Sequence, residues 1–333
     1  MVSASEIQAS NALINDATAP RVAVFMGGTS GIGKSTIQAL IATGVSVRVY
    51  LVGRKSSEEP MRAFIAGLHA VNPKAEVIWT EAEIALLAET RRICNLIQSK
   101  ESCVDLLFLT AGYAPFGRRR ETSEGIEIAQ SLEYYSRILC IQHLLPLLDK
   151  AEAGRVVSVL GGGVEWVNSI NLDDLDLKKP GNFGSVTAQA HYTAMNTITL
   201  DALAKQSPNV TFVHSWPGWV NTGNAKKGIS DPNSVAAWFV RLIILPLVGF
   251  IGLREDESAQ RHLFQSTSAV FGGRGVAWEG QPGINSRGTA ENGLFLVNFR
   301  CNCTPNARVV TLLRERAQEK VWEHTQKVLG PYL

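Results

Sequence analysis

Residues 27–33, GGTSGIG, follow the apolar run RVAVFM at 21–26 and open a segment with the apolar periodicity of a helix. The order of strand, glycine-rich turn and helix is the arrangement that binds the phosphates of a dinucleotide. Gly27 allows a tight turn, Gly31 lets the backbone approach a pyrophosphate, and Gly33 lets helix and strand pack closely. The helix N-terminus offers free N–H groups and a partial positive charge to the anion. This stretch therefore predicts a nucleotide-binding fold.

Further apolar, β-branched runs alternate with helical patterns along the chain. Continuous apolar strands separated by helices indicate a parallel sheet that is buried on both faces. We therefore predict the α/β class, a doubly wound parallel β-sheet of the Rossmann type with helices on both faces. The expected strands are Val22–Met26, Val45–Val52, Glu76–Trp79, Val104–Thr110, Arg155–Leu160 and Val210–Ser215, and the expected helices lie near 34–43, 60–71, 84–99, 124–150 and 188–206.

Three parts are expected along the 333 residues. Residues 1–20 are polar and alanine-rich, lack the apolar stretch of a secretory signal, and are predicted to form an N-terminal arm or short helix. Residues 21–270 form the dinucleotide-binding and catalytic domain. Residues 271–333 form a C-terminal extension of the substrate lobe that packs on the same domain and ends in an amphipathic helix, Val309–Leu329.

The most apolar stretch is Ala236–Leu253, which carries Arg241 and Pro246. It is short for a membrane-spanning helix. We interpret it as a helix of the substrate lobe or a contact in a homo-oligomer. Peripheral contact with a membrane surface is the minority alternative.

The composition limits the classes of partner. An apolar content of 45% with 19% charged residues is typical of a globular protein with a sizeable core. A net charge of +2 gives no electrostatic reason to expect nucleic acid. We expect a small-molecule substrate, a reducing, cytoplasmic setting and no metal site. The five cysteines, which are odd in number and lack disulfide or metal-ligand spacing, are Cys94, Cys103, Cys140, Cys301 and Cys303.

The spacing of the first turn, Gly-x-x-x-Gly-x-Gly, resembles that of the short-chain dehydrogenase/reductase family, and the resemblance extends over about residues 21–270. The second strand ends Gly53-Arg54-Lys55 and lacks the acidic residue that would bind a ribose 2′-hydroxyl. Arg54 and Lys55 can instead bind a 2′-phosphate through charge-assisted hydrogen bonds. The preferred cofactor is therefore NADP(H) rather than NAD(H).

Three later segments resemble cofactor-binding elements of the family. Glu83-Ile84 stands where similar proteins carry Asp-Leu beside the adenine, and Thr110-Ala111-Gly112 replaces Asn-Ala-Gly. Residues 217–222, PGWVNT, match the Pro-Gly-x-Val-x-Thr segment that holds the nicotinamide amide in the family. The resemblance implies a cofactor site made of Gly27, Thr29, Ser30, Gly31, Ile32, Gly33, Arg54, Lys55, Glu83, Ala111, Gly112, Pro217, Gly218, Val220 and Thr222.

Three other segments are similar to the retinol-dehydrogenase and protochlorophyllide-reductase branch of the family. They are Glu124–Glu127, Leu172–Asp176 and Glu255–Ser268. That branch handles bulky, apolar substrates. The resemblance implies a substrate of the same kind here.

The catalytic residues of the family are mostly replaced. Similar enzymes use a Tyr with a Lys four residues later, which lowers the Tyr pKa; here Tyr192 is followed by Asn196. An amide can hydrogen-bond a ribose, but it cannot lower the Tyr pKa from about 10. Gly161 aligns with the Ser that polarises the substrate carbonyl, and Ser158 is expected within the strand. Glu133 aligns with an Asn that supports a water relay.

Three functions remain open on these residues. The first is an NADP(H)-dependent reductase of a bulky carbonyl metabolite, with Tyr192 as a protonated acid, Asn196 on the ribose and Glu133 as a further acid or base. The second is a non-redox isomerase, dehydratase or cyclase, in which Gly161 enlarges the pocket. The third is a catalytically inactive NADP(H)-binding protein. The chain resembles divergent members of the family from fungal secondary metabolism.

Overall fold

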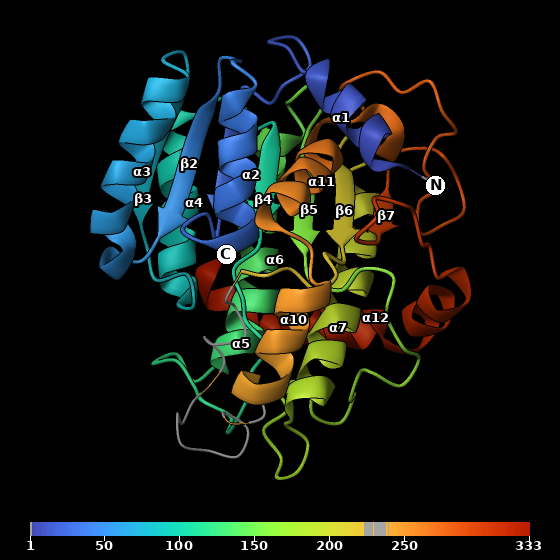
Figure 1. The fold of residues 1–333 in the computed structure, drawn as a ribbon. Coiled ribbons are helices and arrows are strands. Elements are labelled where there is room, and N and C mark those ends of the chain that lie inside the picture. The colour runs from blue at the N-terminus through green and yellow to red at the C-terminus, as the bar shows by residue number, and fades with distance from the viewer. Residues whose placement is uncertain (1, 223–228, 230–237, 239) are drawn as a thin grey trace.

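A seven-stranded, fully parallel sheet with the order β3-β2-β1-β4-β5-β6-β7 forms the centre of the fold (Figure 1). The computed structural model describes residues 2–222, 229, 238 and 240–333. The predicted α/β class and doubly wound sheet are confirmed. The strands are β1 (Val22–Met26), β2 (Arg48–Gly53), β3 (Glu76–Glu81), β4 (Leu106–Leu109), β5 (Arg155–Val159), β6 (Thr211–Ser215) and β7 (Leu294–Val297).

Helices cover both faces of the sheet. In β1, Val24 and Met26 pack on one face, while Ala23 and Phe25 pack on the other. Because both faces of the strands are buried in this way, most strand residues are apolar. Helices α1 (Ala4–Ala12), α2 (Gly31–Ala42), α3 (Glu58–Val71) and α11 (Glu255–Thr267) contribute to the core that contains Phe25, and α4 (Leu87–Lys100), α6 (Ser136–Leu148), α7 (Ser185–Gln206) and α12 (Ala307–Leu329) contribute to the opposite core.

The seventh strand corrects the prediction of six. Strand β7 pairs in parallel with β6, with Phe212 opposite Leu294 and Ser215 opposite Val297. All four of its residues are buried. Such a short strand, following a Gly-rich stretch without a helical pattern, gives little periodic signal of its own. The C-terminal segment therefore contributes a strand to the main sheet.

The helix expected near 124–150 is interrupted. A single helical turn, α5 (Ile128–Gln130), leads into a π-turn, η2 (Ser131–Tyr135), and only then into α6. Glu133 lies at the centre of this π-turn. Such turns within helices are frequent at functional sites. The remaining short elements are η1 (Lys55–Ser57), η3 (Val240–Ile244), α10 (Leu245–Ile251), η4 (Ala269–Phe271) and η5 (Gly330–Tyr332).

The apolar stretch 236–253 is only partly described, because residues 236, 237 and 239 lie outside the described residues. Residues 240–251 form η3 and α10, and Leu242 and Ile243 are exposed. No helix in the described part of the chain is long and apolar enough to cross a membrane.

Candidate active site

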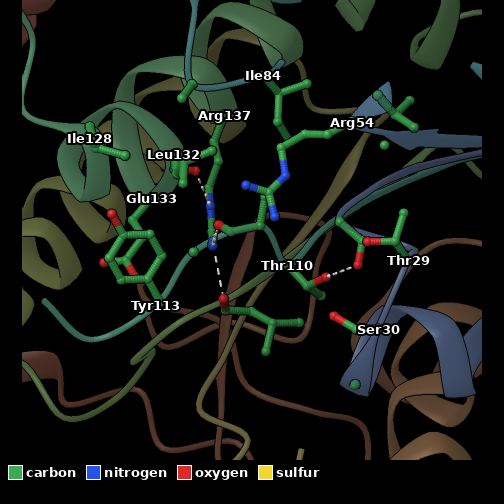
Figure 2. Close-up of a pocket in the computed structure, with 18 of the residues that line it drawn as sticks. Thr29, Ser30, Arg54, Ile84, Thr110, Tyr113, Ile128, Leu132, Glu133 and Arg137 are labelled. Carbon is green, nitrogen blue, oxygen red and sulfur yellow. Dashed lines mark hydrogen bonds between the residues drawn. The ribbon is translucent and has the colours of Figure 1, made fainter. Parts of the chain in front are cut away.

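A cavity of about 860 Å³ lies at the carboxyl ends of the parallel strands (Figure 2). Its walls come from the glycine-rich turn after β1, the end of β2 and the loops that follow β3, β4, β5 and β6. From β1 the chain adds strands first on one side, to β3, and then on the other side, starting with β4, so the strand order reverses between β1 and β4. Open α/β sheets bind their ligands at this kind of crevice, at the point where the strand order reverses.

The glycine-rich turn is held against the end of β4. Gly27 has a φ of 108°, which favours glycine, and a β-carbon there would lie 2.6 Å from the backbone nitrogen of Ala111. The Thr110 hydroxyl donates a hydrogen bond of 3.1 Å to the Gly27 carbonyl. Helix α2 begins at Gly31, and both Gly31 and Ile32 line the cavity. The first turn of α2 is therefore presented to the cavity as an anion-binding end.

The loop after β6 meets the start of α2. A β-carbon on Gly31 would lie 2.9 Å from the β-carbon of Thr222. Backbone hydrogen bonds hold this loop from the other side, because Leu253 donates to Trp219 at 2.7 Å and Asn221 donates to Leu253 at 3.2 Å. The loop expected to hold the nicotinamide therefore closes over the glycine-rich turn.

The structure separates the two basic residues at the end of β2. Arg54 is exposed and lies on the cavity wall, where Figure 2 shows its guanidinium pointing inward. Lys55 begins the short turn η1, and its side chain does not line the cavity. Arg54 is thus the basic group of this pair that can reach a phosphate in the cavity.

Most of the expected cofactor residues gather on this wall. Those that line the cavity are Gly27, Thr29, Ser30, Gly31, Ile32, Arg54, Glu83, Ala111, Gly112, Pro217 and Thr222. The expected residues that do not line it are Gly33, Lys55, Gly218 and Val220. Gly33 packs against the Gly27 carbonyl, and Gly218 packs against Phe299, so these two glycines shape the loops from behind.

Tyr192 does not reach the cavity, which corrects the expectation for the catalytic helix. It is fully buried, and its hydroxyl donates to Oε2 of Glu127 at 3.1 Å. Asn196 is also fully buried, and its amide donates to the backbone carbonyls of Glu133 and Tyr192 at 2.7 and 2.8 Å. The α7 residue on the cavity wall is Gln189. Each residue turns an α-helix by about 100°, so the three steps from Gln189 to Tyr192 leave their side chains about 60° apart around the axis of α7.

Gly161 does not enlarge the cavity, contrary to the alternative considered above. A β-carbon at Gly161 would lie 2.6 Å from Oγ1 of Thr193, so the threonine side chain occupies that space. The Gly161 N–H points to Nε2 of His214 at 3.4 Å. Ser158 lies within β5, and its hydroxyl accepts a hydrogen bond from Arg137.

Glu133 is the carboxyl group on the inner wall of the cavity. It is only 2% exposed, and Oε2 accepts a hydrogen bond of 2.6 Å from the Gln189 amide. The backbone N–H of Tyr113 also donates to this carboxyl. A β-carbon at Gly112 would lie 2.5 Å from Cγ of Glu133, so glycine leaves room for the carboxyl. Burial raises the pKa of Glu133 to about 8, against the opposing effect of the Arg137 charge.

Arg137 fixes the floor of the cavity. Its guanidinium donates to the Ser158 hydroxyl and the Val159 carbonyl at 2.9 Å, and to the Ala111 carbonyl at 2.8 Å. Burial lowers its pKa to about 10, so it remains a cation at neutral pH. It therefore ties the ends of β4 and β5 together beside Glu133.

Sequence reasoning missed five polar residues on the wall. The position of Gln189, about one helical turn before Tyr192 and near the same helix face, is a signal that the sequence does contain. The loop after β4 brings in Arg120, which donates to the Tyr113 hydroxyl at 3.4 Å. The missed polar wall residues are Tyr113, Arg120, Thr122, Arg137 and Gln189.

Comparison with known sequences identifies the family. The family model for short chain dehydrogenase matches residues 21–165. "Oxidoreductase AN1596" of Emericella nidulans is 36% identical over 99% of this chain and 98% of its own length. "NmrA-like family domain-containing oxidoreductase notO" of an Aspergillus species is 34% identical over 99% of this chain and 96% of its own length. The chain therefore belongs to the short-chain dehydrogenase/reductase family of oxidoreductases.

Solved structures share the fold at low sequence identity. The NADPH-bound carbonyl reductase from chicken fatty liver has a TM-score of 0.53 and 15% identity, over 86% of this chain and 98% of that one. The RhlG/NADP active-site complex of Pseudomonas aeruginosa has a TM-score of 0.53 and 20% identity, over 76% of this chain and 92% of that one.

Proposed function

We propose that the chain is an NADP(H)-dependent reductase of a bulky, mostly apolar carbonyl compound. The observation that carries this proposal is one cavity that extends from the glycine-rich turn and Arg54 to the buried carboxyl of Glu133. Such a cavity offers a phosphate-binding end and an acid–base end within a single site. The relatives named as oxidoreductases support a redox reaction.

The residues present fit a dinucleotide with a 2′-phosphate. The first turn of α2 would hold the pyrophosphate, and Arg54 would bind the 2′-phosphate. The loop that ends at Thr222 would hold the nicotinamide end. When bound, the reduced nicotinamide supplies a hydride. The structural neighbours that bind NADP or NADPH support the same choice of cofactor.

The walls beside Glu133 favour an apolar substrate. Ile128 and Leu132 lie beside Glu133 (Figure 2), and Leu160 also lines the cavity. Apolar side chains stabilise a bound apolar group in proportion to the surface removed from water. A few polar groups, such as the Gln189 amide, then remain to orient a carbonyl oxygen.

Calorimetric titration with NADPH and NADH tests the cofactor assignment. We expect NADPH to bind more tightly, and Arg54→Ala to weaken NADPH binding roughly 10–100-fold, because a hydrogen bond to a charged group contributes about 1.5–3 kcal/mol. NADH binding should change little in this variant. Lys55→Ala is the matched control, and its loss of NADPH affinity should be smaller. Equal affinities for the two cofactors in the wild-type protein contradict the assignment.

Absorbance of reduced nicotinamide tests the reaction. We expect the wild-type protein to oxidise NADPH when benzil or progesterone, two bulky apolar ketones, is added. A protein that binds NADPH but consumes none with any bulky ketone would favour the non-redox or binding function instead.

A further inference from the structure

We propose that Glu133, rather than Tyr192, donates the proton to the substrate oxygen, and that Gln189 positions the Glu133 carboxyl for this step. The inference rests on the proposed reductase function. It follows from which side chains α7 and the π-turn η2 bring to the cavity. Glu133 and Gln189 line it, while the hydroxyl of Tyr192 is bonded to Glu127 outside it.

Burial keeps the carboxyl of Glu133 neutral, and two hydrogen-bond donors hold it in place. The partners that hold it are uncharged: the Gln189 amide at 2.6 Å and the backbone N–H of Tyr113. The neighbouring cation, Arg137, directs hydrogen bonds to the hydroxyl of Ser158 and to backbone carbonyls. A buried carboxyl without a close ion pair retains its proton, because burial penalises the charged form.

The proton transfer balances within one turnover. As the hydride adds to the carbonyl carbon, the π electrons of the C=O bond move to the oxygen. That oxygen takes the proton from the Glu133 carboxyl, and the O–H bond of the acid breaks. The products are an alcohol, the oxidised cofactor and a Glu133 carboxylate. The carboxylate then takes up a proton from water that enters the cavity.

The Tyr113 hydroxyl is the rival donor on the same wall. It accepts a hydrogen bond from Arg120 at 3.4 Å. Burial raises its pKa, so it also stays protonated at neutral pH. A phenol is a much weaker acid than a carboxylic acid, and this favours Glu133. The two candidates predict different variants to be inactive, so they can be separated.

Substitution of the acid by its amide is the direct test. Glu133→Gln should lower kcat for NADPH-dependent reduction of benzil by ~10²–10⁴-fold, the usual contribution of general acid catalysis. NADPH affinity, followed by cofactor fluorescence, should stay unchanged. Tyr192→Phe removes a buried hydroxyl of the same helix and is the matched control, which should retain turnover and affinity.

The pH profile separates a positioning role from a packing role. Groups that face Glu133 are Arg137 from α6, Gln189 from α7, Tyr113 from the loop after β4, and Glu127 at the start of α5. Wild-type kcat should fall as pH rises and Glu133 ionises, and Glu133→Gln should lose that dependence. Gln189→Leu removes a donor that stabilises the carboxylate, so the midpoint of the profile should move to higher pH.

Each result supports or overturns the proposal. Glu133→Asp retains an acid, so it should keep a pH-dependent, reduced kcat even if Glu133→Gln folds poorly. Full turnover in Glu133→Gln, or a loss confined to Tyr113→Phe, overturns the role of Glu133 while the reductase function stands. A wild-type protein that binds NADPH but reduces no ketone overturns both.

Discussion

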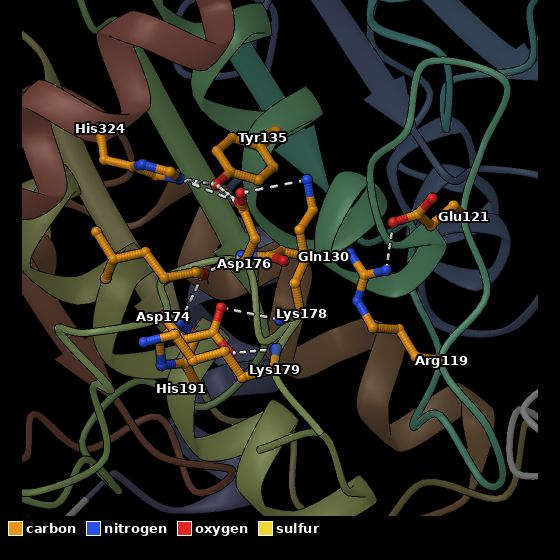
Figure 3. A network of polar contacts seen from close by, with 11 residues as sticks. Arg119, Glu121, Gln130, Tyr135, Asp174, Asp176, Lys178, Lys179, His191 and His324 are labelled. Carbon is orange, nitrogen blue, oxygen red and sulfur yellow. Dashed lines mark hydrogen bonds and ion pairs between the residues drawn. The ribbon is translucent and has the colours of Figure 1, made fainter. Parts of the chain in front are cut away.

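Two carboxyl groups, the buried Glu133 in the π-turn and the half-buried Asp176 beside it, differ in the direction of their pKa shift. Glu133 belongs to η2 and lines the cavity, and burial raises its pKa to about 8. Asp176 precedes α7 and accepts a hydrogen bond of 2.7 Å from Tyr135, the last residue of η2 (Figure 3). Burial raises its pKa too, but His324, Tyr135 and Lys178 outweigh that effect and lower it to about 2.

The difference comes from the partners of each carboxyl. His324 of α12 lies 3.1 Å from Asp176, and the ammonium of Lys178 lies 3.6 Å away. Hydrogen bonds and positive charge stabilise the ionised form of Asp176, which then ties the C-terminal helix to the π-turn. Glu133 has the uncharged Gln189 as its side-chain donor. One carboxyl is therefore a structural anion, and the other is held as a neutral acid.

The largest effect on stability should come from removing the ionisable group of Glu133. Its folded-state pKa lies above the ordinary 4.5, so the folded protein binds this proton more tightly than the unfolded chain does. The cost of ionisation is absent below about pH 4.5, grows as pH rises, and is complete above about pH 8. Glu133→Gln should therefore be more stable than wild type at about pH 9, by on the order of 3–5 kcal/mol.

Urea unfolding at two pH values measures this effect. The advantage of Glu133→Gln should shrink to nearly nothing at about pH 3.5, below the ordinary pKa of 4.5, where the wild-type carboxyl is protonated in both states. If Glu133→Gln exceeds wild type in stability by the same amount at both pH values, the effect does not come from ionisation of Glu133. Glu133 would then not differ from Asp176 in the direction of its pKa shift.

Asp176→Asn should have a smaller effect, in the opposite direction. Its folded-state pKa of about 2 lies below the ordinary 3.8, so its ionised form contributes about 2 kcal/mol at neutral pH. That contribution is present above about pH 4 and disappears as pH falls through about 2. Unfolding in urea at neutral pH should show the loss, and the exposed neighbour Asp173→Asn should show none. Equal stability of the two variants would mean that the ion pair contributes nothing.

Tyr135→Phe should have the smallest effect, about 1.5 kcal/mol, the lower end for a hydrogen bond to a charged group, because the Asp176 carboxylate keeps His324 and Lys178 as partners. The double variant Tyr135→Phe/Asp176→Asn should lose less unfolding free energy than the two single variants lose together, because both substitutions remove the same hydrogen bond. Strict additivity in a double-mutant cycle would show that Tyr135 acts independently of Asp176.

Local patterns in the sequence predicted most of the sheet and its glycine-rich turn. Buried strands such as Val22–Met26 are continuous apolar runs, and the turn at 27–33 depends on glycine itself. Strand β7 was missed because four residues give little periodic signal. The π-turn η2 was missed because one widened turn hardly disturbs the apolar spacing of a helix.

The catalytic residues could not be predicted from motif spacing, because tertiary packing decides which side chains of α7 reach the cavity. The spacing of Tyr192 and Asn196 fits the family pattern, but the orientation of α7 buries both residues. Tyr192 packs with Ala129, Leu177 and Ala188, and this packing leaves Gln189 on the cavity wall. Glu133 was singled out by alignment, while the burial that retains its proton could be seen only in three dimensions.

The protonation state of Glu133 is the most direct test of this comparison. Infrared difference spectra of wild type and Glu133→Gln, recorded across a pH titration, isolate the carboxyl band of Glu133. We expect a protonated carboxyl band at neutral pH that disappears with a midpoint near pH 8 and is absent from the variant. A Glu133 band that already shows an ionised carboxylate at neutral pH, with a midpoint near the ordinary 4.5, would contradict its role as a neutral acid.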